Sequence, residues 1–266
     1  MRLVSLPKFS IPRSFRYTTC MAQAVGNNAE KKLIRIDVSS DTVCPWCFVG
    51  KRNLDKAVAS SKDQYDFEIR WHPYFLNLSL PKEGICKKSY YDHRFGTKRF
   101  EQMFAQMKEI FKGFGLEYNI SGLTGNTMDS HRLIYFAGQH GLDKQHNLVD
   151  ELCVGYFTQG KYIGDREFLV ECARKVGVEG AAEFLEDPNN GLKEVNEEVE
   201  EYSSRITGVP YYLINGKLRL SGGQPPLVFL QAFQTAARMP VMGSVLKSSR
   251  RIRATRTRKG KKKHRD

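Results

Sequence analysis

The sequence has no apolar stretch of the length that crosses a membrane, which takes about 18 or more consecutive apolar residues. It has six cysteines in 266 residues, a much lower density than in small secreted proteins that disulfides hold together. Its first twenty residues lack the continuous apolar core of a secretory signal. We therefore expect neither a membrane protein nor a disulfide scaffold, and we expect a cytoplasmic location.

Acidic residues are almost missing from both ends of the chain. Residues 1–29 carry four Lys or Arg and no acid, and residues 247–266 carry eleven Lys or Arg and one Asp. The formal net charge of +13 therefore leaves a net of −1 for residues 30–246, so basicity says nothing about the chemistry of the folded part. We expect residues 1–30 to be a disordered extension, with a mitochondrial or plastid presequence as the alternative.

Residues 241–266 contain too little apolar surface to fold, and we expect a disordered basic tail there. Such a tail leaves one function of another class open, a nucleic-acid-binding module or a nuclear import signal. No aromatic residues are interleaved with its charges to stack on bases. We favour a solvated tail, and expect no nucleic-acid partner except through it.

A strand, a helix and a second strand are predicted in residues 31–75. The segment Leu33–Val38 alternates apolar and polar residues, as a half-covered strand does. The apolar spacing after residue 48 favours a helix, and "YDFEIRWHP" (Tyr65–Pro73) alternates again. Such a unit implies parallel strands with a right-handed crossover.

Helical periodicity dominates from about Tyr90 to Tyr202, and we expect a helical insertion over residues 76–205 without strands. About five helices are predicted in it, within residues 99–115, 127–141, 143–160, 165–177 and 191–206. Asp165 is a good N-cap for one of them, and Gly141 and Gly177 stand where helices should end.

Strand patterns return in residues 206–240, where Asn215-Gly216 predicts a tight hairpin and a last helix follows. A lone hairpin and a lone strand–helix–strand unit are both too small to be stable. The sequence therefore predicts an α/β protein, with one sheet that is interrupted by an all-helical insertion.

The segment "VCPWCFVG" (residues 43–50) places two cysteines, Cys44 and Cys47, between the first strand and its helix. A structural zinc site needs four ligands, but there is no second Cys-x-x-Cys and the histidines stand alone, so we expect no metal. A disulfide across so short a loop gains little stability. Redox chemistry remains the favoured interpretation.

A thiolate at a helix N-terminus is stabilised by unpaired backbone N–H groups and the helix dipole. We therefore assign Cys44 as the attacking and more exposed thiol, and Cys47, one helical turn inward, as the resolving thiol. Pro45 suits the first helical turn, where its missing N–H costs nothing. We expect Trp46 to face outward beside the sulfurs.

This arrangement resembles the thioredoxin fold. The segments "DVSSDTVCPWCFVG", "GNTMDSHRL", "YFTQGKYIGDREFL", "GVPYYLING" and "SGGQPP" resemble the DsbA-like FrnE family, thioredoxin-fold proteins with a helical insertion. The resemblance implies a cis-proline at Pro210 beside the cysteines. It also implies that the backbone of Val209 receives an extended peptide or glutathione.

Other side chains carry weaker signals. His131 has the type of side chain that moves protons near neutral pH, but a lone helical histidine is more often structural, and both interpretations stay open. Cys153 and Cys172 fall on apolar helix faces and should be buried, whereas Cys86 should be exposed and oxidisable. Helical spacing predicts core packing for Met103, Phe104, Met107 and Phe111.

The sequence as a whole predicts a DsbA-like protein disulfide oxidoreductase that exchanges a dithiol and a disulfide at its Cys-Pro-Trp-Cys pair. Its partner would be a thiol or disulfide of a protein or small molecule. We expect no tightly bound cofactor, with glutathione as an alternative co-substrate. The rival on the same fold is a glutathione-dependent isomerase or kappa-class-like glutathione transferase. Those relatives characteristically carry serine where this chain has Cys44.

Overall fold

The computed structural model describes residues 31–239. The expected N-terminal extension, with its alternative as a presequence, and the expected basic tail lie outside these residues. Within them, no helix combines the length and the apolar character that crossing a membrane would take.

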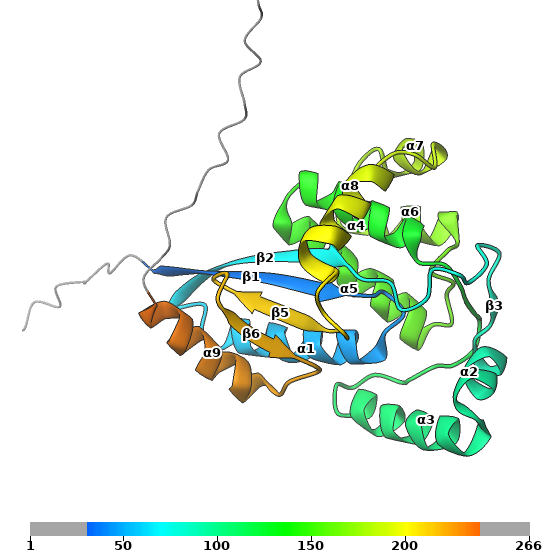
Figure 1. Ribbon diagram of the computed structural model, residues 1–266, viewed down its shortest axis with the longest axis horizontal. Helices are drawn as coiled ribbons and strands as arrows, with labels where there is room; N and C mark the ends of the chain where they lie inside the picture. Colours follow the sequence, from blue (N-terminus) through cyan, green and yellow to red (C-terminus); the bar gives the residue numbers. More distant parts are fainter. Residues whose placement is uncertain (1–30, 240–266) are drawn as a thin grey trace, which may run out of the picture. The chain divides into compact units, whose positions relative to one another are not determined.

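A four-stranded sheet forms the centre of the fold, in the order β2-β1-β5-β6 (Figure 1). Strand β1 (Lys32–Ser40) pairs in parallel with β2 (Tyr65–Pro73) and antiparallel with β5 (Tyr211–Ile214), which forms a hairpin with β6 (Leu218–Ser221). The predicted parallel unit and hairpin are therefore both confirmed. The hairpin turns at Asn215 and Gly216, both with positive φ (48° and 68°), as the dipeptide predicted.

Two helices of the thioredoxin-like part, α1 (Pro45–Ala59) and α9 (Pro226–Arg238), pack together on one side of this sheet (Figure 1). The chain between β2 and β5 is the insertion. Its helices α4 (Met128–Gln139) and α5 (Leu142–Thr158) contact the edge strand β2. The architecture is therefore a thioredoxin-like fold with a helical insertion, as the resemblance implied.

The insertion continues with α6 (Arg166–Lys175), α7 (Ala181–Glu186), α8 (Leu192–Glu198) and a π-helical turn, η1 (Val199–Ser203). The Asp165 carboxylate accepts the N–H groups of Glu167 and Phe168, so this residue caps α6 as predicted. Gly141 and Gly177 each lie just beyond a helix end, with φ of 134° and 73°.

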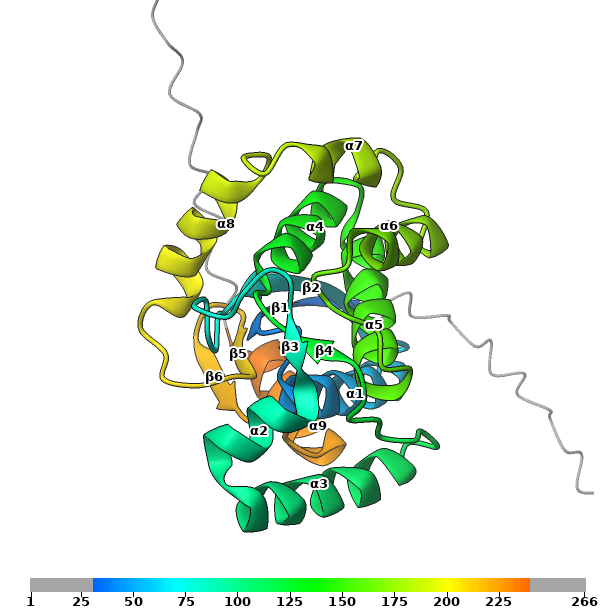
Figure 2. The same cartoon turned by 90° about the vertical axis from the view of Figure 1, so that its right-hand side faces the viewer.

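The first part of the insertion departs from the prediction. Helix α3 (Thr97–Lys112) contacts α1, and α2 (Lys87–Phe95) packs against α3, away from α4, α6 and α7 (Figure 2). A two-residue strand, β3 (Ile85–Cys86), precedes α2 and pairs with β4 (Leu123–Thr124). The inserted segment is therefore mostly helical rather than all-helical. Two-residue strands carry no periodicity from which sequence could predict them.

His72 on β2 connects the sheet to the end of the insertion. Its Nε2 lies 3.0 Å from Asp37 Oδ1, its Nδ1 lies 3.2 Å from Glu198 Oε2, and its ring stacks on Tyr202 with 3.6 Å between centroids. Burial by itself lowers the pKa of His72, but the hydrogen bonds and charges of the two carboxylates outweigh it and raise that pKa above its ordinary value.

A histidine whose pKa is raised by folding stabilises the protein fully below its unfolded pKa of about 6.5, and loses that contribution as pH rises through the folded pKa. We expect His72→Gln to lower the free energy of unfolding by about 1.5–3 kcal/mol at pH 6, the range for hydrogen bonds to charged groups, and by clearly less at pH 9. Urea unfolding at both pH values measures this. The matched control is His140→Gln at an exposed position, and an equal cost of His72→Gln at the two pH values would contradict the interpretation.

Gly50 fixes how closely α1 approaches β5. A Cβ at Gly50 would collide with the Tyr212 hydroxyl and would lie 3.1 Å from Pro210 Cγ. That hydroxyl is buried and has no hydrogen-bond partner among residues 31–239. The close packing of α1 on β5 therefore depends on the missing side chain at this glycine.

We expect Gly50→Ala to lower the free energy of unfolding by about 1–3 kcal/mol, the usual cost of an overpacked core. Adding Tyr212→Phe should restore most of this loss, because it removes the colliding oxygen and leaves the ring carbon Cζ at 3.4 Å. Urea unfolding of the two single variants and the double variant tests the coupling. If the unfolding free-energy changes of the two single variants simply add in the double variant, the Cβ at residue 50 and the Tyr212 hydroxyl do not collide.

Candidate functional site

The two cysteines lie at the N-terminus of α1, as predicted. Cys44 is the N-cap residue, Pro45 occupies the first turn, and the N–H of Cys47 donates to the Cys44 carbonyl at 3.0 Å. The N–H of Cys44 donates to the Asp41 carbonyl at 3.1 Å, which closes the turn between β1 and α1. Both cysteines are free thiols.

The two thiols are similarly exposed, but their chemical surroundings differ. Cys44 is 6% exposed and Cys47 2% exposed, so the predicted order holds but both are buried. Burial raises the pKa of Cys47 well above its ordinary value, and the hydrogen bond and charge of Cys44 raise it further. The side chain of Ser40 and the backbone of Asp41 act in the opposite direction. Cys47 is therefore a protonated thiol, and the Ser40 side chain and the Asp41 backbone favour its thiolate form.

The Val209–Pro210 peptide bond is cis, as the family resemblance implied. The carbonyl of Val209 lies 3.8 Å from Cys44 Sγ, and Pro210 is buried while Val209 is partly exposed. The fold therefore brings together two predicted site elements that lie 165 residues apart in the sequence.

Trp46 faces outward beside the pair, as predicted, and is 37% exposed. Its ring packs on the segment after β6, where a Cβ at Gly223 would lie 3.0 Å from Trp46 Cε3. This contact places the indole over the rim of the site.

His131 lies behind the active-site turn. It is 3% exposed, and its Nε2 lies 3.7 Å from Asp41 Oδ1. The Asp41 carboxylate in turn accepts the backbone N–H of Leu76 at 2.7 Å and of Val43 at 3.3 Å. His131 therefore contacts the site through Asp41, which lies in the turn that precedes the cysteines.

The neighbouring hydroxyls support the same turn. The Oγ atoms of Ser130 on α4 and of Thr42 lie 2.9 Å apart, within hydrogen-bond distance. The start of α4 therefore holds the loop that leads into the cysteine pair.

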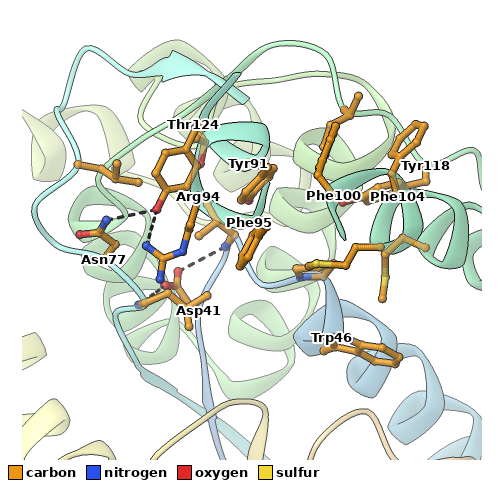
Figure 3. A pocket seen from close by; sticks show the side chains of 18 of the residues that line it. Asp41, Trp46, Asn77, Tyr91, Arg94, Phe95, Phe100, Phe104, Tyr118 and Thr124 are labelled. Carbon is orange, nitrogen blue, oxygen red and sulfur yellow. Dashed lines mark hydrogen bonds between the residues drawn. The ribbon is translucent and has the colours of Figure 1, made fainter. Parts of the chain in front are cut away.

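A cavity of about 340 Å³ opens beside the turn, between the active-site helix and the first part of the insertion (Figure 3). Val43 and Pro45, which flank Cys44 in the sequence, form part of its wall together with Trp46, whereas Cys44 itself does not line it. Most of the remaining wall is aromatic or aliphatic, and comes from α2, α3 and the segments around them: Leu76, Leu80, Tyr90, Tyr91, Phe95, Phe100, Met103, Phe104, Met107, Tyr118 and Ile120.

The prediction of plain core packing for the methionine and phenylalanine cluster was correct only in part. Met107 and Phe111 are buried at 4% and 0% exposure. Met103 and Phe104 are partly exposed and line the cavity, a role that sequence reasoning missed. The available signal was the apolar face of this helix, but periodicity does not distinguish a core face from a cavity wall.

The other three cysteines among residues 31–239 are buried or exposed as predicted. Cys153 and Cys172 are buried at 3% and 0% exposure, and burial raises the pKa of the Cys172 thiol to about 12. Cys86 is exposed, and hydrogen bonds from Ser89 lower the pKa of its thiol. None of the three lines the cavity beside Cys44.

Known proteins of similar sequence and structure indicate the family of this chain. The crystal structure of a probable DsbA oxidoreductase, SCO1869 from Streptomyces coelicolor, is 28% identical and has a TM-score of 0.69, with 78% of this chain and 92% of that chain covered. The uncharacterized protein YwbO of Bacillus subtilis (strain 168) is 25% identical over 189 residues, which cover 68% of this chain and 86% of YwbO.

A structure of 2-hydroxychromene-2-carboxylate isomerase has a TM-score of 0.57 at 13% identity, with 77% of this chain and 96% of that chain covered, a similarity of fold alone. The DSBA-like thioredoxin domain matches residues 35–234, which is most of the sequence and includes both cysteines and the cis-proline. The chain belongs to the DSBA-like thioredoxin domain family.

Proposed function

We propose that the protein is a thiol–disulfide oxidoreductase of the DsbA-like FrnE type, with Cys44 and Cys47 as its exchanging pair. The observation that carries the proposal is the placement of Cys44 at the N-terminus of α1, with its sulfur 3.8 Å from the carbonyl before the cis-proline. Cys47 lies one turn behind it, within reach of the same sulfur.

The reaction needs no group beyond the two thiols and the substrate disulfide. The Cys44 thiolate attacks one substrate sulfur, a mixed disulfide forms, and the departing thiolate takes a proton from solvent. Cys47 then loses its proton and attacks Cys44 Sγ, which forms the Cys44–Cys47 disulfide and releases the second substrate thiol. Two electrons pass from the protein to the substrate, and the reverse sequence oxidises a substrate dithiol.

The residues around the pair have separate roles in this proposal. The Val209 backbone receives the substrate next to Cys44, and Pro210 holds that backbone in place. Ser40 and the Asp41 backbone assist the thiolate of Cys47. Trp46 covers the rim. The substrate is the thiol or disulfide of a protein or small molecule, with glutathione as the alternative co-substrate, and the location is the cytoplasm.

The cavity favours a second candidate, a glutathione-dependent isomerase or kappa-class-like transferase, because such enzymes enclose small molecules. The shared fold with the isomerase is compatible with it. A second cysteine at residue 47 has no evident use in such a reaction, so exchange remains the first choice.

A redox titration of the full-length protein against glutathione tests the proposal. We expect a reversible two-electron transition with a midpoint between about −270 and −120 mV, the range of known exchange pairs, read from Trp46 fluorescence and from the mass after thiol alkylation. Cys47→Ser should abolish the transition and accumulate a mixed disulfide at Cys44. Cys86→Ser is the matched control and should leave the midpoint unchanged. No transition, with glutathione still bound, would favour the second candidate.

The resolving step should quicken as pH rises. Burial is the largest cause of the raised pKa of Cys47, and it persists while Cys44 is held in a mixed disulfide. Below that pKa, the thiolate fraction of Cys47 and hence the resolution rate grow about tenfold per pH unit. Acid quenching and mass spectrometry of the glutathione mixed disulfide between pH 6.5 and 9 measure its lifetime. A lifetime independent of pH would mean that Cys47 is already ionised at neutral pH.

A further inference from the structure

The cavity near Cys44 is partly open to solvent, and aromatic rings form much of its wall. Phe100 and Tyr118 in its wall are only 7% and 8% exposed, and burial raises the pKa of Tyr91 to about 12, so its hydroxyl stays neutral. Its volume of about 340 Å³ falls in the range of small-molecule sites. Rings on several sides favour an occupant with an apolar, preferably aromatic, body.

One cationic side chain, Arg94 of α2, stands in this wall (Figure 3). Its Nη1 donates to the Tyr90 hydroxyl at 3.1 Å, and its guanidinium lies 5.9 Å from the centroid of that ring and 5.7 Å from that of Phe95. Among residues 31–239 it forms no ion pair with an acid. Arg94 is exposed, so its guanidinium stands at the open rim of the cavity, and its neutral partners occupy only part of it.

Asp41, the acid in the same wall, does not compete for this charge. Both of its carboxylate oxygens accept backbone N–H groups, from Val43 and from Leu76. The amide of Asn77 donates to the Tyr90 hydroxyl at 3.2 Å and thereby fixes the ring that orients Arg94. A planar guanidinium so held matches the two oxygens of a carboxylate.

We propose that this cavity binds a small disulfide or thiol with an apolar aromatic body, whose carboxylate pairs with Arg94 and whose sulfur reaches Cys44. This inference rests on the exchange activity proposed above and names its substrate class. The exchange is the balanced reaction already given, with the released thiols as products. Glutathione fits this wall poorly, because it carries several charges and no apolar body of comparable size. Its place would be the backbone at Val209.

Binding is best tested apart from exchange, in full-length protein carrying Cys44→Ser. Calorimetric titration compares biphenyl-4-carboxylate with biphenyl-4-methanol, which has the same body without the charge. We expect the acid to bind more tightly than the alcohol. Arg94→Met should weaken binding of the acid about tenfold and leave the alcohol nearly unchanged, as expected for loss of one charge-assisted contact.

The matched control is Arg99→Met, because Arg99 is an exposed arginine of α3 outside the cavity wall, and it should leave both affinities unchanged. Met103→Trp should abolish binding of both ligands by filling the cavity, and its thermal unfolding midpoint checks that it folds. Equal affinity for acid and alcohol overturns the proposal. So does binding of an unfolded apolar peptide without binding of the acid, which would assign the cavity to a protein side chain.

The two proposals fail separately. Binding of the acid without a redox transition of the unmodified protein refutes exchange and leaves an apolar carboxylate site. A redox transition without binding of the acid refutes the cavity assignment alone.

Discussion

The position of the active-site helix depends on the burial of Phe48, the residue after Cys47. Its side chain is fully buried, with its ring centroid 5.8 Å from that of Phe157 on α5 and 5.4 Å from that of Phe111 on α3. Burial of a phenylalanine contributes about 1.5–3 kcal/mol, and the ring pairs add to it. Because this cluster ties the first turn of α1 to two separate helices of the insertion, the thiols and the cavity wall keep a fixed relation.

The site combines two parts of the fold with different tasks. The sheet and its helices supply the thiols, the cis-proline and the close approach of Gly50 to β5, which together suit disulfide exchange. The insertion supplies α2 and α3, whose rings and Arg94 enclose a neighbouring space. Residues of the second group can change the choice of substrate while the chemistry at the first group stays the same.

Short-range patterns predicted much of the fold. The strand–helix–strand unit, the turn at Asn215 and the cap at Asp165 each depend on a few adjacent residues, so sequence reveals them. The helix α2, the short α7 and the strand pair β3–β4 were missed, because they are short and take their stability from tertiary contacts.

The site, too, has parts that adjacent residues in the sequence reveal and parts that only tertiary contacts create. The cysteines and the residues around the cis-proline belong to recognisable motifs. The cavity does not, since its wall joins residues from 41 to 127 that only the folded chain brings together. For His131, the sequence left a structural and an acid–base role open, and only the structure revealed that it contacts Asp41.

The long insertion also determines when the exchange site is completed as the chain is made. Cys44 and Cys47 leave the ribosome early, whereas Val209 follows 165 residues after Cys44, and β5 must pair with β1 across that distance. Closing so long a loop is slow compared with local helix formation. During synthesis, the thiols of Cys44 and Cys47 therefore coexist with those of Cys153 and Cys172 before the last strands join the sheet. A reducing environment protects such a chain from pairing the wrong cysteines while it folds.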